Sequence, residues 1–461
     1  MRSTVLALLF ASALAAQTTA PETPAGKVFT VWLTAFNSAD AAQLRAINET
    51  FQTEAPPVEM MLDFRDQTGG FTVLRIEKSE PRKLVALVQE KGSDTVARLE
   101  ITLTPEDPPK ITALGLQAIP RPADLAIPRL NEADALAALS ARVEELTKSD
   151  QFSGVVLVAR HGRILLQKAW GRANRETGAP VTLDTRLRLG SMNKMFTATA
   201  TLQLVEAGKL GLDDHIGKYL PGYPNQAVAT QVTIRHLLTH TGGTGDIFGP
   251  DFEKNRLTLR EHGDYLKLYG SRAPLFAPGA EWRYSNYGFV LLGAIVEKVS
   301  GMTYYDYVRK KIFEPSGMTA TDSLPESEAV PNRANGYMKR NGAWVSNAET
   351  LPWRGTAAGG GYSTAGDLLR FAEALGSGKL LSQKRLGEAT RPQREHYGYG
   401  FDIQGEGQLS SYGHGGGAPG MNGELRVYPQ LGYVLVALSN LDPPAASRVV
   451  DFYALRMPVG P

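Results

Sequence analysis

The sequence predicts an α+β protein with two domains, each built on an antiparallel sheet. Near the N-terminus, short runs of alternating apolar and polar residues follow a helical stretch. Similar runs lie at both ends of residues 131–461, whose middle part has helical periodicity. Residues 119–130 between the two groups contain three prolines and no periodic pattern, which is typical of a semi-rigid linker.

Composition excludes several classes of protein. The chain has 461 residues, of which 43% are hydrophobic and 21% are charged, as in ordinary globular proteins. Its 49 Lys and Arg residues nearly balance 47 Asp and Glu residues, so the net charge of +2 gives no basis for binding nucleic acid. The sequence contains no cysteine, which excludes disulfides, thiol nucleophiles and zinc–thiolate sites.

Residues 1–20 are predicted to be a secretory signal peptide. Arg2 precedes an apolar run of about 12 residues, and Ala13 and Ala15 have the small-residue spacing of a cleavage site. A membrane anchor is the alternative, but a spanning helix needs about 20 apolar residues. We therefore expect a periplasmic or secreted protein without stable membrane insertion after cleavage.

Residues 25–118 are predicted to form a small α+β domain. Two helical patterns in residues 27–51 are interrupted at 37–40, where Asp40 can cap the second helix. Alternating runs at 71–76, 84–88 and 95–103 are typical of antiparallel strands. Through the AFNSAD stretch at 35–40, this region resembles nuclear-transport-factor-like domains. It contains no recognisable catalytic constellation.

Residues 131–461 are predicted to form the larger domain, which begins with a helix capped by Asn131. Neither end of this region can bury the face of a sheet alone, so we expect one sheet assembled from both ends around a helical middle. The expected strands are 153–159, 164–170, 423–428 and 433–439, and the expected closing helix is 443–455.

Ser191 and Lys194 form the first candidate catalytic pair. They lie three residues apart at the start of a predicted helix over 195–207, which places them on one helical face. A serine hydroxyl needs a base, and burial near a helix N-terminus can lower the pKa of a lysine enough to serve. The alternative is that Ser191 only caps the helix.

Two further stretches can contribute to the same chemistry. Tyr284 and Asn286 lie in the segment Tyr-Ser-Asn, where a phenol can relay a proton and an amide can fix a lysine and a substrate. A core aromatic residue beside a turn is the alternative interpretation. Residues 413–420 are glycine-rich and enter a predicted strand, so a substrate could approach its edge closely, although a flexible turn would look the same.

In this order, the three pieces resemble the serine β-lactamase and penicillin-binding-protein family. Tyr284-Ser285-Asn286 matches the Tyr-x-Asn of the class C branch, and His414-Gly415-Gly416 stands where most members have Lys-Thr-Gly. The resemblance extends to four flanking stretches, LGLDDHIGKYLP, TIRHLLTHTGG, WRYSNYGFVLLG and AAGGGYSTAGDLLRF. It implies the β-lactamase/transpeptidase-like fold, in which an antiparallel sheet is flanked by helices and joined by a helical subdomain.

The resemblance also implies roles for individual residues. Ser191 would be the acylated nucleophile, and Lys194 and Tyr284 would handle protons, with the choice of acylation base left open. The substrate-binding residues would be Asn286, His414, Gly415, Gly416 and Gly417. The oxyanion hole would use the backbone N–H groups of Ser191 and Gly417.

Histidine at 414 bears on the substrate. Lysine at this place gives β-lactamases a permanent cation for the antibiotic's carboxylate, whereas histidine is mostly neutral at pH 7. We therefore expect weak or no β-lactam hydrolysis. Family members with His-x-Gly resemble carboxylesterases and D-amino-acid-specific peptidases. An esterase for small acyl esters is the first expectation, and a D-aminopeptidase or DD-carboxypeptidase is the second.

A binding protein that keeps the fold without activity is the alternative from another class, although it would not need all the catalytic side chains. The expected partner is a small ester or D-amino-acid amide, with no cofactor and no metal, and the oligomeric state is left open. Ser363, in a near match to the Gly-x-Ser-x-Gly elbow, is interpreted as part of a helix start capped by Thr364. The loop at 242–250 is expected to select acyl groups.

Overall fold

The computed structural model describes residues 19–51, 56–340 and 342–460. The chain divides into two compact units between Pro128 and Arg129. Most of the signal peptide predicted for residues 1–20 lies outside the described residues. None of the helices within the described ranges combines the length and apolar character that crossing a bilayer requires.

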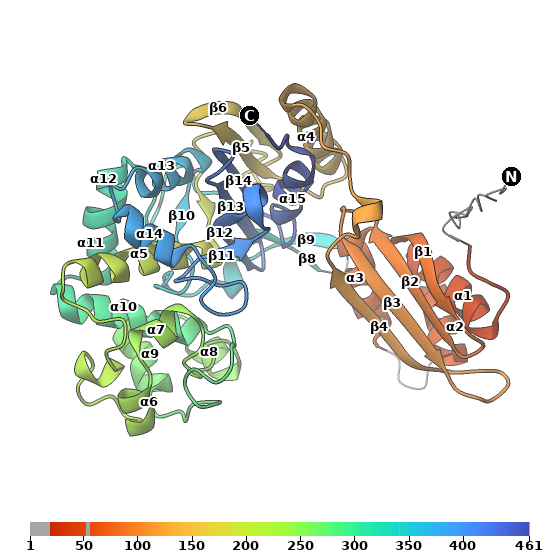
Figure 1. Ribbon diagram of the computed structural model, residues 1–461, viewed down its shortest axis with the longest axis horizontal. Helices are drawn as coiled ribbons and strands as arrows, with labels where there is room; N and C mark the ends of the chain where they lie inside the picture. The colour runs from red at the N-terminus through yellow and green to blue at the C-terminus, as the bar shows by residue number, and fades with distance from the viewer. Residues whose placement is uncertain (1–18, 52–55, 341, 461) are drawn as a thin grey trace, which may run out of the picture. The chain divides into compact units, whose positions relative to one another are not determined.

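The first unit is a four-stranded antiparallel sheet in the order β1-β2-β3-β4, preceded by three helices (Figure 1). Aromatic side chains of α1, among them Trp32 and Phe36, pack on Leu84, Ala86 and Leu99 of the sheet. The elements are α1 (Pro24–Ser38), α2 (Ala41–Phe51), α3 (Val58–Thr68), β1 (Phe71–Ser79), β2 (Lys83–Glu90), β3 (Val96–Leu103) and β4 (Ile111–Ile119).

Local chemistry explains the break between the first two helices. Ala39 has a left-handed backbone, with φ of 57°, and ends α1. Asp40 Oδ1 then accepts hydrogen bonds from the N–H groups of Ala42 and Gln43, as the sequence predicted for a cap. The likeness to nuclear-transport-factor-like domains stays a prediction.

In the first unit, the structure adds two elements that the sequence patterns did not predict, α3 and β4. In α3, Met61 is buried but the neighbouring Met60 is 61% exposed, which blurs the helical period. In β4, Ile111 is the one buried position, and Gly115 interrupts the strand pattern. Ile119 closes β4, so the linker predicted from 119 begins one residue later and contains a single 3₁₀ turn, Ala123–Leu125.

The second unit contains a six-stranded antiparallel sheet in the order β11-β12-β13-β14-β5-β6. Strand β14, near the C-terminus, pairs with β5 along its whole length from Tyr433↔Arg160 to Ser439↔Gly154. The prediction of one sheet built from both ends of this region is therefore confirmed. The strands are β5 (Gly154–Arg160), β6 (Arg163–Trp170), β11 (Asp402–Gln404), β12 (Ser411–Ala418), β13 (Met421–Tyr428) and β14 (Tyr433–Ser439).

Helices cover both faces of this sheet. Helices α4 (Glu132–Lys148) and α15 (Ser447–Arg456) pack on one face, where alternate residues of β5 such as Val156 and Val158 meet Leu139 and Val143. Asn131 caps α4 by accepting a hydrogen bond from the N–H of Asp134, as predicted. The opposite face packs on α5 (Asn193–Glu206) and α13 (Ala365–Gly376).

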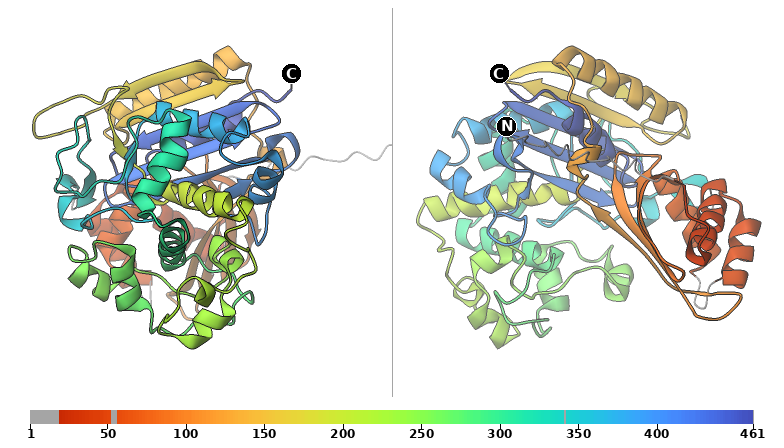
Figure 2. Two further views of the ribbon diagram at one scale, coloured as in Figure 1. Left: turned by 90° about the vertical axis from the view of Figure 1, so that its left-hand side faces the viewer. Right: turned by 45° about the vertical axis from the view of Figure 1, so that its right-hand side comes forward.

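Helix α5 is the central helix of the second unit, and it runs between the sheet and the smaller helices (Figure 2). Residues 193–202 are all buried, so the helix has no solvent-facing polar stripe. The other helices are α6 (Gln226–Gln231), α7 (Ile234–Leu238), α8 (Pro250–Asn255), α9 (His262–Tyr269), α10 (Asn286–Ser300), α11 (Tyr304–Val308), α12 (Glu314–Ser316) and α14 (Gln383–Ala389). Two small two-stranded sheets pair β7 (Leu187–Arg188) with β10 (Tyr362–Ser363) and β8 (Tyr337–Arg340) with β9 (Ala343–Ser346).

Candidate active site

Ser191 lies on a tight turn, Gly190–Met192, that leads from β7 into α5. Two glycine-rich segments hold this turn. On one side, Gly360 N–H donates to the carbonyl of Gly190. On the other, a Cβ on Gly416 would lie 1.9 Å from the carbonyl oxygen of Leu189, so only glycine permits β12 to approach this closely. The nucleophile candidate is therefore fixed by contacts from distant parts of the chain.

Lys194 lies one turn further along α5 and is fully buried. Its Nζ is 3.1 Å from Ser191 Oγ, 2.7 Å from Asn286 Oδ1 and 2.5 Å from the carbonyl oxygen of Ala358. Burial lowers the pKa of Lys194 to about 7, although the more distant charges of Asp246 and Asp402 act in the opposite direction. A substantial neutral fraction of this amine therefore exists at neutral pH.

The partners of Lys194 also orient its lone pair. A neutral amine has two N–H bonds, and the oxygens of Asn286 and Ala358 can only accept. When both N–H bonds point to these two oxygens, the lone pair of Nζ faces the hydroxyl of Ser191. This is the geometry that proton transfer from a serine to a lysine requires.

Tyr284 comes from the segment just before α10, and its ring lies beside Lys194, with Nζ 4.6 Å from the ring centre. The buried ring of His240 packs against it, with the ring centres 4.3 Å apart. Burial raises the pKa of Tyr284 above its ordinary value, while interaction with the Ser191 hydroxyl lowers it in part. The phenol is therefore protonated at neutral pH and can donate a hydrogen bond.

Asn286 is the first residue of α10, and the orientation of its amide is fixed at both ends. Its Oδ1 accepts from Lys194, while its Nδ2 donates to both carboxylate oxygens of Asp246 at 3.0 and 3.1 Å. Ser285 caps the helix, since its Oγ accepts a hydrogen bond from the N–H of Gly288. Asp246 belongs to the loop at 242–250, and sequence reasoning did not single it out.

His414 lies on β12, but its side chain is buried and satisfied inside the protein. Nδ1 donates to the carbonyl oxygen of Gly415 at 2.5 Å, and Nε2 accepts from the hydroxyl of Tyr397 at 2.9 Å. Burial lowers the pKa of His414, although Asp402, 3.7 Å from Nδ1, opposes this change. The imidazole is therefore neutral at pH 7 and presents no cation to a substrate.

A cavity of about 240 Å³ opens beside Ser191. Of the expected binding residues, Asn286 and Gly417 line it, whereas His414, Gly415 and Gly416 do not. The position of His414 thus differs from the expected one, because its ring turns toward Tyr397. Most of the wall is apolar, and its apolar side chains include Ile247, Phe248, Phe252, Leu351, Pro352 and Met421.

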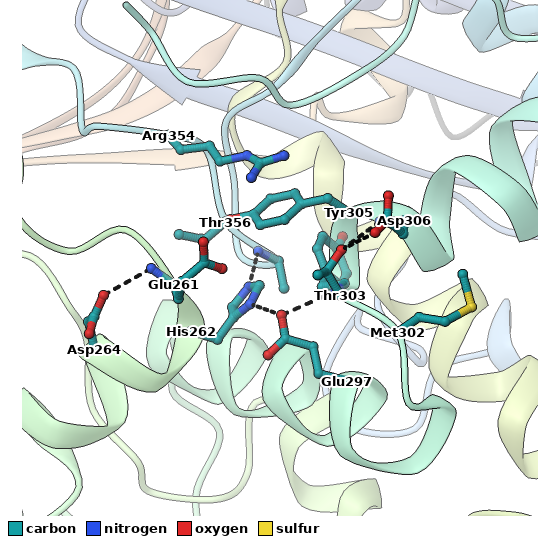
Figure 3. Close-up of polar contacts among 12 residues, drawn as sticks. Glu261, His262, Asp264, Glu297, Met302, Thr303, Tyr305, Asp306, Arg354 and Thr356 are labelled. Atoms are coloured by element: carbon teal, nitrogen blue, oxygen red, sulfur yellow. Dashed lines mark hydrogen bonds and ion pairs between the residues drawn. The ribbon is translucent and has the colours of Figure 1, made fainter.

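The buried His262 and the partly buried Glu297 form a pair that supports the site from behind, and sequence reasoning missed it (Figure 3). Nδ1 of His262 lies 3.0 Å from Glu297 Oε1, and Nε2 accepts from the N–H of Ala357 at 3.1 Å. A Cβ on Gly293 would lie 2.7 Å from this Nε2, so glycine is needed there. The pair therefore fixes the segment whose next carbonyl, that of Ala358, binds Lys194.

Ser363 is not part of this site. It is fully buried, and its hydroxyl lies 2.6 Å from that of Thr321. Thr364 caps α13 by accepting a hydrogen bond from the N–H of Asp367, which confirms the predicted helix start.

Comparison with known proteins identifies the family of this chain. A family model described as Beta-lactamase matches residues 139–457. The chain belongs to the β-lactamase family. The resemblance inferred from the sequence motifs is therefore confirmed, and with it the β-lactamase/transpeptidase-like fold and the assignment to the serine hydrolases.

Individual relatives of this β-lactamase-family chain include enzymes with different names. It is 31% identical to penicillin-binding protein 4* of Bacillus subtilis (strain 168) over 325 residues, which cover 64% of this chain and 70% of the relative. It is 33% identical to esterase EstB of Burkholderia gladioli over 312 residues, covering 60% and 79%. The crystal structure of a penicillin-binding protein from Bacillus halodurans superposes with a TM-score of 0.62 and 33% identity, covering 67% of this chain and 97% of that one.

Proposed function

We propose that this protein is a serine carboxylesterase that cleaves small acyl esters through an acyl-enzyme on Ser191. The observation that carries the proposal is the position of Ser191, which lies 3.1 Å from an amine of pKa about 7 and lines a mainly apolar cavity. An apolar wall suits an uncharged acyl chain. The similarity to an esterase supports the same choice.

In the acylation step, Ser191 Oγ attacks the ester carbonyl while its proton passes to neutral Lys194. The tetrahedral oxyanion is held by the backbone N–H groups of Ser191 and Gly417. The second group adjoins the turn, because a Cβ on Gly190 would lie 3.0 Å from the Gly417 nitrogen. The leaving alcohol then takes a proton from the Lys194–Tyr284 pair, and the acyl group stays on Ser191.

In the deacylation step, water attacks the acyl carbonyl and gives its proton to the same pair. The Ser191 oxygen then recovers a proton as the carboxylic acid leaves, so one ester and one water yield one acid and one alcohol. We assign the role of the base in acylation to Lys194, because burial lowers the pKa of Lys194 and raises that of Tyr284.

Hydrolysis of D-amino-acid amides is a second candidate, and Glu253 is the observation that favours it. Glu253 lines the cavity and is exposed to solvent. A carboxylate at this place could pair with the ammonium group of such a substrate. Weak or no β-lactam hydrolysis is expected in either case, since His414 offers no cation to the antibiotic.

A side-by-side assay tests the proposal. A short-chain p-nitrophenyl ester, a D-alanyl p-nitroanilide and a chromogenic cephalosporin should be hydrolysed in that order of kcat/KM. S191A should abolish all hydrolysis, and a phosphonate should label Ser191 in a sequenced peptide. Activity lost in folded S363A but kept in S191A would contradict the assignment, and no turnover by folded wild type would favour a binding protein.

We further propose that the protein is exported and works in the periplasm or outside the cell. The support is the composition of residues 1–20 described above. Expression with its own N-terminus in a Gram-negative host, followed by cell fractionation and N-terminal sequencing, tests this. A full-length chain that stays in the cytoplasm would contradict it.

A further inference from the structure

Arg354 is a cation in the wall of the same cavity that holds Ser191. Among the described residues that line this cavity, the charged side chains are Arg354 and Glu253. Glu253 is exposed on α8, whereas Arg354 is half-buried. The proposed esterase chemistry does not use Arg354, so its presence in a mainly apolar wall needs its own explanation.

Two contacts hold the guanidinium group of Arg354 in place. Its Nε donates a hydrogen bond to the carbonyl of Ser323, and its guanidinium carbon lies 3.3 Å from the centre of the Tyr305 ring (Figure 3). Tyr305 is itself buried, and its hydroxyl donates to the carbonyl of Gly355. The cation therefore rests on a fixed aromatic surface.

The two terminal nitrogens of Arg354 remain available. No carboxylate in the described part of the chain lies within 4.0 Å of them, and they make no hydrogen bond to another described residue. Neighbouring arginines differ, because Arg188 pairs with Glu326 and Arg309 pairs with Asp322. An arginine with a fixed plane and two free N–H edges is suited to bind a carboxylate with two parallel hydrogen bonds.

We propose that Arg354 forms a carboxylate subsite, and that the preferred substrates are esters whose acyl group carries a second, ionised acid. This inference rests on the proposed esterase function and specifies its substrate class. The apolar wall would hold the methylene chain, and Arg354 would bind the terminal carboxylate.

Matched pairs of substrates test the subsite. Mono-p-nitrophenyl esters of glutaric, adipic and pimelic acids are compared with p-nitrophenyl esters of the monocarboxylic acids of equal chain length, after subtraction of spontaneous hydrolysis. The wild type should favour the acidic ester at one of these lengths. R354M should lower kcat/KM for that ester by about 10- to 100-fold and leave the neutral ester within about twofold, as expected for loss of a charge-assisted contact.

Two further variants act as controls. R354K should recover part of the preference, because it keeps the charge but not the paired geometry. E253Q should raise kcat/KM for the acidic ester, because it removes a negative charge from the wall of the cavity. Equal losses for both esters in R354M would overturn the subsite and leave Arg354 with only its contacts to Ser323 and Tyr305.

A binding measurement separates this inference from the esterase proposal. If the wild type hydrolyses neither ester, the esterase proposal fails, and calorimetry with the free dicarboxylates and folded S191A decides the subsite. Binding that R354M abolishes would support it. Absence of binding to S191A, or equal binding to S191A and S191A/R354M, would overturn it.

Discussion

Lys194 and Arg426 are both cations that the fold removes from water, but their surroundings have opposite effects on their charge. Lys194 is 0% exposed and Arg426 is 7% exposed. Within the described part of the chain, the oxygens that hydrogen-bond the amine of Lys194 are all neutral, and burial lowers its pKa to about 7. Burial alone would lower the pKa of Arg426. The carboxylates of Glu424 at 3.0 Å and Asp451 at 2.9 Å outweigh this effect, so the pKa lies above its ordinary value.

This difference shows that burial alone does not make a base. A buried cation with a carboxylate in contact stays charged and stabilises structure, whereas one surrounded by amide and hydroxyl oxygens can lose its proton. The carboxylate of Asp246 does not touch Lys194: it accepts hydrogen bonds from the amide of Asn286, and its charge acts on Lys194 from a distance. The amide of Asn286 lies between the Asp246 carboxylate and Lys194. The carboxylate therefore orients this amide, but it is too distant to keep Lys194 protonated.

The largest effect is expected from K194M, which removes the base and keeps an apolar chain in its place. The value of kcat/KM for a short ester should fall by about 10³-fold or more, as for other members of a catalytic set. Steady-state kinetics on protein with an unchanged circular dichroism spectrum measures this. K194R should be as inactive, because arginine does not deprotonate, and activity in K194R would contradict the role of a neutral amine.

R426M should affect stability and not chemistry. It leaves the buried carboxylate of Glu424 without its partner, so the free energy of unfolding should fall by about 3–5 kcal/mol. Urea denaturation measures this loss, while kcat/KM per folded molecule should stay close to the wild type. K267M removes the exposed pair with Asp264 and should change stability by less than about 1 kcal/mol. If R426M lowered the free energy of unfolding as little as K267M does, the stabilising role of Arg426 would be contradicted.

The pH profile tests the state of Lys194 directly. The reactive form is the neutral amine, which predominates above its pKa of about 7 and disappears as the pH falls. The value of kcat/KM should therefore drop about tenfold per pH unit below that pKa. Unfolding followed at each pH is the control, and a profile that is flat from pH 5 to 8 would contradict a lysine base.

D246N should produce the smallest effect. The carboxylate of Asp246 opposes the lowering of the Lys194 pKa, and an asparagine can still accept from Asn286. The acidic limb of the pH profile should therefore move to lower pH, with kcat/KM at pH 8 within a fewfold of the wild type. A limb that moves upward, or that does not move, would show that the charge of Asp246 does not reach Lys194.

Local spacing made part of this site predictable from the sequence. Ser191 and Lys194 are three residues apart at the start of a helix, so the helical repeat alone brings them together. Four strands of the large sheet, β5, β6, β13 and β14, could be predicted, because β14 is a short continuous apolar run and apolar residues alternate with charged ones in the expected strand at 423–428. Strands β11 and β12 were not predicted. Tyr284 and Asn286 could be placed only through the family resemblance, since nothing local joins them to Lys194.

The remaining partners depend on contacts across the chain that no local pattern records. Asp246 is one acidic residue in an ordinary loop, and it matters only because α10 presents Asn286 to it. His262 and Glu297 are 35 positions apart and come from different helices. The buried orientation of His414 depends on its hydrogen bond with Tyr397. The terminal nitrogens of Arg354 are available because no carboxylate in the described part of the chain lies within 4.0 Å of them.

The order of the strands has a consequence for when activity can arise during synthesis. The turn that carries Ser191 rests against Gly416, and the sheet joins β5 to β14, which ends at Ser439. A ribosome-bound chain that has emerged only through α13 already contains the serine, the lysine and the tyrosine, but it lacks the backbone against which they are aligned. We therefore expect the nascent chain to stay inactive until β12 and β14 have emerged and joined the sheet.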